Sequence, residues 1–251
     1  SPGPSAGTAG TTNTGGGGGG GGNNGTAQGG AGGPGVVIVK ELDKASGVWD
    51  MNTVFDEVAA GNWIKRTATV DYLVVAGGGA GASTFGAGGG AGGYRASGYG
   101  PSPLRGCSLS LRNGSYAVTV GSGGATNNQA GATDATSGSP SIFSTITSTG
   151  GGFGKQDQNN TPVSPTGRAG PGGSGGGGSA GSSNTGPEAR QGGLGNTPPV
   201  SPSQGSNGGT GFSGPSGPVM AAGGGGGAGG AGGNASSNQG GTGGVGVPNA
   251  I

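Results

Sequence analysis

Glycine recurs with a period of three along several stretches of this chain. In residues 223–233, GGGGGAGGAGG, alanine occupies positions 228 and 231, and all the remaining residues are glycine. A period of three belongs neither to an α-helix, with about 3.6 residues per turn, nor to a strand, whose side chains alternate. It is the period of an extended left-handed helix of the polyproline II type. The same spacing recurs in residues 86–92 and 167–176.

The chain has few apolar side chains from which to build a core. Glycine accounts for 75 and proline for 16 of the 251 residues, and Leu, Ile, Val and Phe make up about one residue in eight. This composition alone is typical of a disordered chain. An ordered chain would need backbone hydrogen bonds between closely packed extended helices to offset its conformational entropy. We therefore predict a bundle or sandwich of polyglycine II helices, with a few short β-strands and one short α-helix.

The sequence divides into three parts. Residues 1–40 are glycine-rich and end in a β-branched run that predicts a strand at 36–39. Residues 41–66 are a connector of different composition, and residues 67–251 are the main glycine-rich module. Within the module we expect strands or extended chain at 70–76, 115–120 and 141–149.

The connector contains the one predicted α-helix. Four apolar residues recur at i, i+3, i+4 and i+7, which places them on one helical face: Met51, Val54, Phe55 and Val58. We predict a short amphipathic helix near Asp50–Ala60. Trp49 and Trp63 flank it, and together with Phe55 they are the candidates for packing between units.

Residues 71–81, DYLVVAGGGAG, imitate the start of a dinucleotide-binding fold. That fold needs a helix after the glycines and an acidic residue about 20 positions later. Here no helical period follows, and the next acidic residue is Asp134. We interpret the motif as a strand entering a glycine segment, and we expect no cofactor.

The residue types that carry most enzyme chemistry are scarce. Histidine is absent and Cys107 is the single cysteine, so we expect no zinc or other metal site, no catalytic residues and no enzyme activity. The formal net charge is +1 with 8% charged residues, which does not favour nucleic-acid binding. The longest apolar run, residues 73–76, is too short for membrane insertion.

An ordered series of motifs resembles the glycine-rich modules of bacteriophage tail-fibre and adhesin proteins. The motifs are VDYLVVAGGGAG, GAGGGAGGYR, SYAVTVGSGGA and FSTITSTGGG. The closing signature of such modules is similar to residues 29–39, GGAGGPGVVIV. The stretch SGVWDMNTVFDEVAAGNW, residues 46–63, looks like the segment that joins modules in phage fibre proteins, cyanophage ones among them.

The resemblance implies a structural fibre protein of a phage virion whose surface loops contact a host-cell receptor. The alternative is a subunit of a cellular or environmental extracellular filament. Binding in either case is expected in the long loops, since aromatic and arginine side chains dominate interface hot spots. The candidates for a binding surface are Tyr94, Tyr99, Arg105, Phe153, Lys155 and Phe212. The alternative role of the aromatic residues is to cap the ends of the bundle.

The motif order raises the question of how residues 1–40 pack. Residues 29–39 look like the end of a module and residues 70–76 like the start of the next one. This order is expected if copies of the chain join head to tail. We expect residues 1–40 to complete the bundle of an adjacent unit, with the connector at the joint. The alternative is that they fold back onto residues 70–251 of their own chain.

Overall fold

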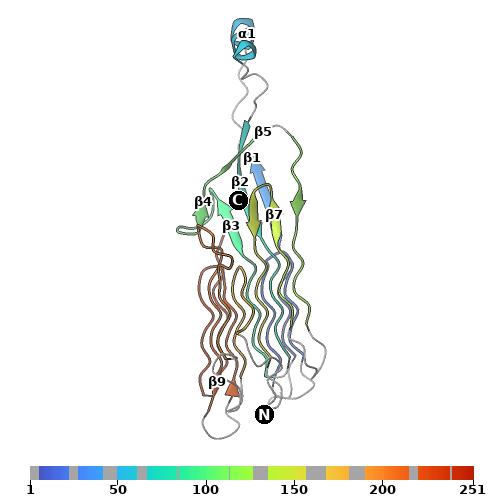
Figure 1. Ribbon diagram of the computed structural model, residues 1–251, viewed down its shortest axis with the longest axis vertical. Helices are drawn as coiled ribbons and strands as arrows, with labels where there is room; N and C mark the ends of the chain where they lie inside the picture. The colour runs from blue at the N-terminus through green and yellow to red at the C-terminus, as the bar shows by residue number, and fades with distance from the viewer. Residues whose placement is uncertain are drawn as a thin grey trace.

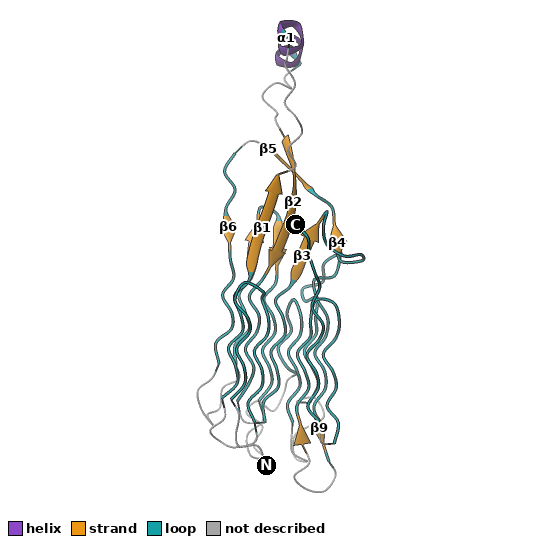
Figure 2. Cartoon of the chain, turned by 180° about the vertical axis from the view of Figure 1, so that it is seen from behind, coloured by secondary structure: helices purple, strands orange, loops and turns teal. Residues whose placement is uncertain are grey.

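The regular secondary structure is mostly β-strand. The computed structural model describes residues 6–22, 28–41, 50–60, 67–83, 85–112, 114–126, 135–156, 168–180, 190–214, 220–237 and 239–251. Within them the chain forms one α-helix, α1 (Met51–Ala59), and ten strands (Figures 1 and 2): β1 (Val36–Glu41), β2 (Thr67–Val75), β3 (Tyr94–Ser97), β4 (Arg105–Gly106), β5 (Leu109–Arg112), β6 (Val118–Thr119), β7 (Ser141–Phe143), β8 (Ile146–Ser148), β9 (Phe212–Ser213) and β10 (Met220–Ala221). The predicted bundle of polyglycine II helices is therefore wrong.

Strands form where consecutive side chains interrupt the glycine. β-Branched and aromatic residues favour the pleated surface of a sheet, where each packs against its neighbours. The strands expected at 36–39 and 70–76 correspond to β1 and β2, and the stretch 141–149 contains the β7–β8 hairpin. Of the run 115–120, only Val118–Thr119 is strand. The prediction treated glycine as the sole structural material and so missed β3, β4, β5, β9 and β10.

β2 is the central strand of the largest sheet. β1 pairs with it antiparallel along one edge, from Val36 opposite Val75 to Glu41 opposite Val70. β3 and β5 share the other edge, β3 opposite residues 73–75 and β5 opposite residues 67–70, and β4 runs parallel to β3. The second sheet has the order β6-β7-β8, and β9 pairs with β10 in a third.

The apolar core lies on both faces of β2. On one face Val70, Tyr72 and Val74 pack with Phe143 of β7. On the other, Leu73 and Val75 form a cluster with two residues of β3, and residues near the end of the sequence, among them Val247 and Ile251, cover it. Because both faces are covered, β2 is an almost continuous apolar run rather than an alternating one.

The glycine segments continue the strands away from the sheets. They carry no helix or strand assignment and lie side by side as extended chain, drawn as loops beneath the strands in Figure 2. Their N–H groups donate to neighbouring segments in turn. In residues 77–82 the acceptors are the carbonyl oxygens of Ser139, Gly33, Gly90, Thr136, Gly30 and Ala87, in that order. Every third residue therefore bonds to the same neighbouring segment, at N···O distances of 2.8–3.1 Å.

At many of its glycine positions this packing leaves no room for a Cβ atom. A Cβ atom on Gly89 would collide with the carbonyl oxygen of Gly79, and one on Gly226 with that of Ser206. Both contacts would lie well below 3.0 Å, a limit that real Cβ atoms do not cross. Glycine is thus required at these two positions by the approach of neighbouring backbone.

Residues near the start of the sequence pack on the rest of their own chain. β1 pairs with β2, and the glycine segments before β1 donate to the glycine segment that follows β2, as in the bond from Gly18 N–H to Gly79 O at 2.9 Å. This is the fold-back arrangement, and the expected insertion into an adjacent unit is incorrect. The antiparallel register explains the result, because it places the β-branched residues of β1 directly beside β2.

α1 lies apart from the sheets (Figure 1) and falls within the predicted range 50–60. The side chain of Asp50 caps its first turn, since its Oδ1 accepts from Asn52 N–H at 2.9 Å. Met51, Phe55 and Val58 are 86%, 71% and 51% exposed. Three of the four apolar side chains that predicted an amphipathic helix are therefore exposed, and Val54 is half-buried.

Candidate functional site

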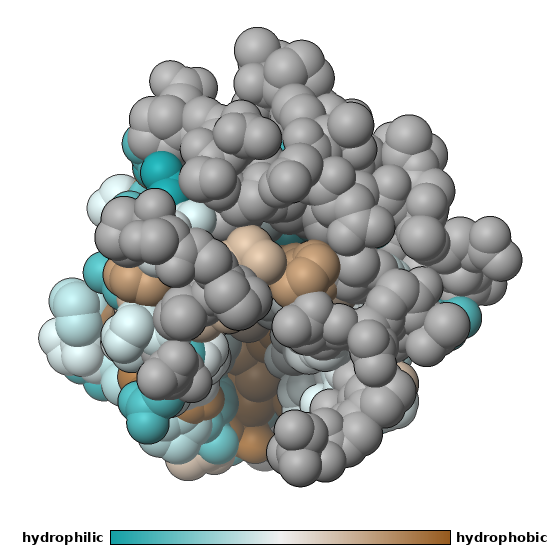
Figure 3. All heavy atoms as spheres, turned by 90° about the horizontal axis from the view of Figure 1, so that it is seen from below, coloured by the Kyte–Doolittle hydropathy of each residue, from teal (hydrophilic) through white to brown (hydrophobic). Residues whose placement is uncertain are grey.

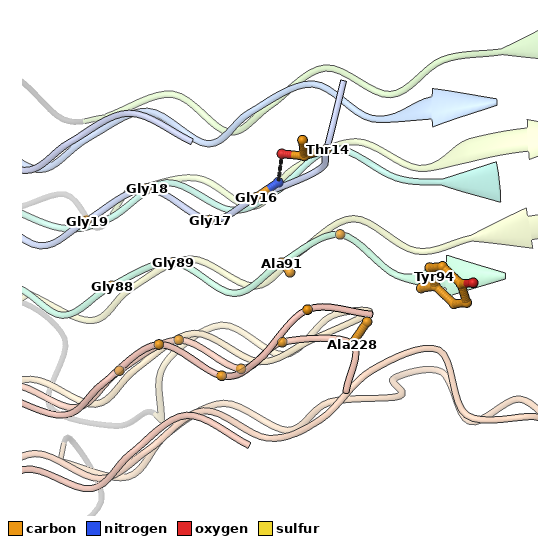
Figure 4. A pocket seen from close by; sticks show the side chains of 18 of the residues that line it. Thr14, Gly16, Gly17, Gly18, Gly19, Gly88, Gly89, Ala91, Tyr94 and Ala228 are labelled. Carbon is orange, nitrogen blue, oxygen red and sulfur yellow. Dashed lines mark hydrogen bonds between the residues drawn. The ribbon is translucent and has the colours of Figure 1, made fainter. Parts of the chain in front are cut away.

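A glycine-walled groove separates two groups of segments. Its volume is about 860 Å³, and four stretches line most of it: residues 14–20, 86–94, 222–228 and 240–249. Seen from below in Figure 3, brown hydrophobic surface lies inside a hollow of the molecule. Figure 4 shows Gly88, Gly89 and Ala91 between the stretch that carries Gly16–Gly19 and the stretch that carries Ala228. Residues 86–92 thus form the base of the groove, and the other stretches flank it.

The sheet end of the groove is apolar and contains Tyr94. Leu73, Val75 and Val247 line it with Tyr94, which is 5% exposed. The Tyr94 hydroxyl accepts a hydrogen bond from Asn249 Nδ2 at 2.7 Å. Burial raises the pKa of Tyr94 above its ordinary value of 10.0, and the bond from Asn249 opposes this shift. The hydroxyl is therefore neutral at physiological pH, and Tyr94 lines this end of the groove.

The walls of the groove present backbone N–H groups without acceptors. Those of Gly17, Gly20, Gly225 and Ala228 donate to no acceptor among the described residues, whereas their neighbours in the same stretches do donate. Gly225 is itself buried. A buried N–H without a partner costs about 1–3 kcal/mol and is rare in native structures. The groove therefore contains backbone donors that a ligand could use.

A family model described as a glycine-rich domain matches residues 57–250. The chain belongs to this glycine-rich domain family. No curated protein and no solved structure shows significant similarity to it. The match to the glycine-rich domain begins inside the connector and leaves β1 outside it, although β1 forms one edge of the largest sheet.

The predicted surface residues of this glycine-rich domain are not brought together. Arg105 lies in β4 of the largest sheet, and its Nη1 donates to Gly98 O at 3.3 Å. Tyr99 lies close to the same sheet, and its hydroxyl accepts from Lys40 Nζ at 2.9 Å. Phe212 lies in β9, toward the opposite end of the molecule (Figure 1). A single binding surface built from all of them does not exist.

Several of the other candidates are not available at the surface. Tyr94 and Lys155 are buried, and Phe153 is partly buried. The Tyr94 ring packs in the core cluster of Leu73 and Val75 and is not part of an exposed surface. Trp49 and Trp63, proposed to pack between units, lie outside the described residues, and Phe55 is exposed on α1.

Two buried polar residues of the glycine-rich domain were not singled out from the sequence. Asp71 in β2 accepts from Ser97 Oγ at 2.8 Å and also from Ser108 Oγ. Its position within the apolar run VDYLVV was a usable signal, because a buried carboxylate requires polar partners. Gln204 is 1% exposed and bonds to Thr149 through both ends of its amide, at 2.9 and 3.2 Å. No sequence pattern identifies it.

The groove residues were missed as well, although a signal was present. The three-residue spacing noted in residues 223–233 is also the spacing between Gly225 and Ala228, and Gly17 and Gly20 repeat it. In the described residues no group of three or more His, Cys, Asp or Glu side chains is arranged to hold a metal ion. No described helix is long and apolar enough to span a membrane, and Cys107 is a free, exposed thiol.

Proposed function

We propose that this chain is a structural subunit of a fibre, in first place a phage tail fibre, and that it associates with copies of itself. Virion or extracellular localisation follows from that role. The proposal is supported by membership of the glycine-rich domain family and by the motif series that resembles phage fibre modules. It rests most directly on one structural observation, the uncovered apolar face of α1.

The apolar face of α1 is suited to contact with another molecule. Met51, Phe55 and Val58 lie on one face of a nine-residue helix that stands away from the sheets. An isolated helix of this length is marginal in water, and most helical stability comes from packing of the apolar face. Burial against the same face of a second copy would provide that packing. Arg105, in β4 of the largest sheet, and Tyr99, close to that sheet, remain the best placed of the candidates for receptor contact.

Sedimentation velocity across a concentration series tests the proposal. We expect the native chain to form concentration-dependent assemblies and Phe55→Ser to remain monomeric, because the substitution removes the largest apolar side chain of α1. Asp56→Ser is the matched control, on an exposed residue of the same helix, and should assemble as the native chain does. A native chain that stays monomeric at all concentrations, or a Phe55→Ser variant that assembles normally, would contradict the proposal.

A further inference from the structure

We infer that the groove binds an extended glycine-rich segment of a second polypeptide chain, through backbone hydrogen bonds. This inference rests on the groove and not on α1, so it goes beyond the fibre role proposed above. Three observations carry it: the arrangement of the walls, their unpaired N–H groups and the identity of the residues at their open positions.

The two walls converge on one carbonyl group at the base of the groove. A Cβ atom on Gly17 would collide with Gly89 O, and a Cβ atom on Gly225 would collide with the same oxygen. Gly17 and Gly225 therefore lie on either side of Gly89, as Figure 4 shows for their stretches. The backbone of each wall is in direct contact with the backbone of the base. A segment bound along residues 86–92 would therefore contact both walls.

The unpaired donors recur at the interval seen inside the packed layer. Gly17 and Gly20 are three residues apart, as are Gly225 and Ala228. In the packed segment 77–82, every third N–H bonds to the same neighbouring segment. The stretch 14–20 has neighbours for Gly18 and Gly19, which donate to Gly79 O and Thr8 O. Gly17 and Gly20 have no such neighbouring segment among the described residues. A segment bound in the groove would supply carbonyl oxygens to them at the same three-residue interval.

Glycine also occupies positions where this chain alone does not require it. Added Cβ atoms on Gly243 and Gly246 would meet nothing within 4 Å, yet both residues line the groove. At the packed positions, by contrast, neighbouring backbone excludes a side chain. Glycine at 243 and 246 leaves the space that a second backbone needs. An occupant that comes this close to backbone on several sides must itself be rich in glycine.

The test uses a soluble peptide and residue-resolved NMR of the Phe55→Ser chain, at a concentration where sedimentation velocity finds it monomeric. The probe is the peptide GGAGGAGG, and the control is SSASSASS, which has the same length but carries side chains where the probe has none. We expect the GGAGGAGG peptide to shift the amide signals of Gly17, Gly20, Gly225 and Ala228 saturably and to slow their exchange with solvent. Unchanged signals, or equal shifts with the serine peptide, would overturn the inference.

A variant of the groove gives the second arm of the test. A Cβ atom at Gly243 meets nothing within 4 Å, so we expect Gly243→Val to fill open space and to keep the melting temperature of the native chain. It should weaken peptide binding about tenfold or more, because several backbone hydrogen bonds are lost. Gly114→Val is the matched control, at an equally open glycine outside the groove, and should bind normally. Peptide binding that is unchanged in Gly243→Val would contradict the assignment to the groove. Since binding is read on a chain that cannot assemble through α1, its outcome is separate from that of the fibre proposal.

Discussion

At the scale of the residue, glycine has two different roles in this chain. At positions such as 89 and 226, neighbouring carbonyl groups occupy the place of a side chain. At 114, 243 and 246, the corresponding space is open. Sequence inspection does not separate the two groups, because both occur in similar glycine-rich surroundings.

Valine at a packed glycine should destabilise the molecule strongly. Gly89→Val and Gly226→Val should each lower the free energy of unfolding by roughly 2–4 kcal/mol, as overpacking and lost backbone hydrogen bonds together imply. The bonds at risk include Gly89 N–H to Gly18 O and Ala91 N–H to Gly226 O. Thermal unfolding followed by circular dichroism measures the effect, and Gly114→Val is the control. An unchanged melting temperature for either packed variant would refute the packing described here.

At the scale of the element, strands were predictable where β-branched residues are consecutive. β1 and β2 follow from their Val and Ile content, and α1 follows from the spacing of Met51, Phe55 and Val58. β3 was missed because YRAS has no β-branched residue, and its strand geometry depends on pairing with residues 73–75 of β2. Strands of two residues, such as β4 and β9, carry too little sequence to indicate anything.

A buried amide links elements that are distant in the sequence. The Gln204 side chain bonds to Thr149, which follows β8. The main-chain carbonyl oxygen of Gln204 accepts from the N–H of Tyr94, the first residue of β3, at 2.8 Å. Gln204→Ala would leave the Thr149 N–H and the Pro198 carbonyl without this partner. We expect a loss of about 2–3 kcal/mol in chemical denaturation, since unpaired buried groups are costly. Gln239→Ala, at an exposed glutamine, should be neutral. Equal stability of the two variants would show that the Gln204 side chain does not link these elements.

At the scale of the whole molecule, the glycine period indicated backbone contact but not the architecture. The period of three does appear in the hydrogen bonds of residues 77–82. The predicted helix bundle was wrong because the few apolar residues are concentrated in strands and form cores on both faces of β2. The packing of residues 6–22 and 28–41 on their own chain was also not predictable, since the sequence fits both that arrangement and exchange between units. The three-residue spacing of Gly17 and Gly20 and of Gly225 and Ala228 was visible in the sequence, but it did not indicate that four distant stretches come together around a groove.

Residue-resolved hydrogen exchange tests most directly whether backbone hydrogen bonds between glycine segments hold this molecule together. The account predicts strong protection of the amides of residues 77–82, including Gly78 and Gly81, which bond to the stretch before β1. It also predicts rapid exchange at Gly17 and Gly20, whose N–H groups have no acceptor in the described part of the chain. Uniformly fast exchange throughout residues 77–82, with protection confined to the β-strands, would contradict the account.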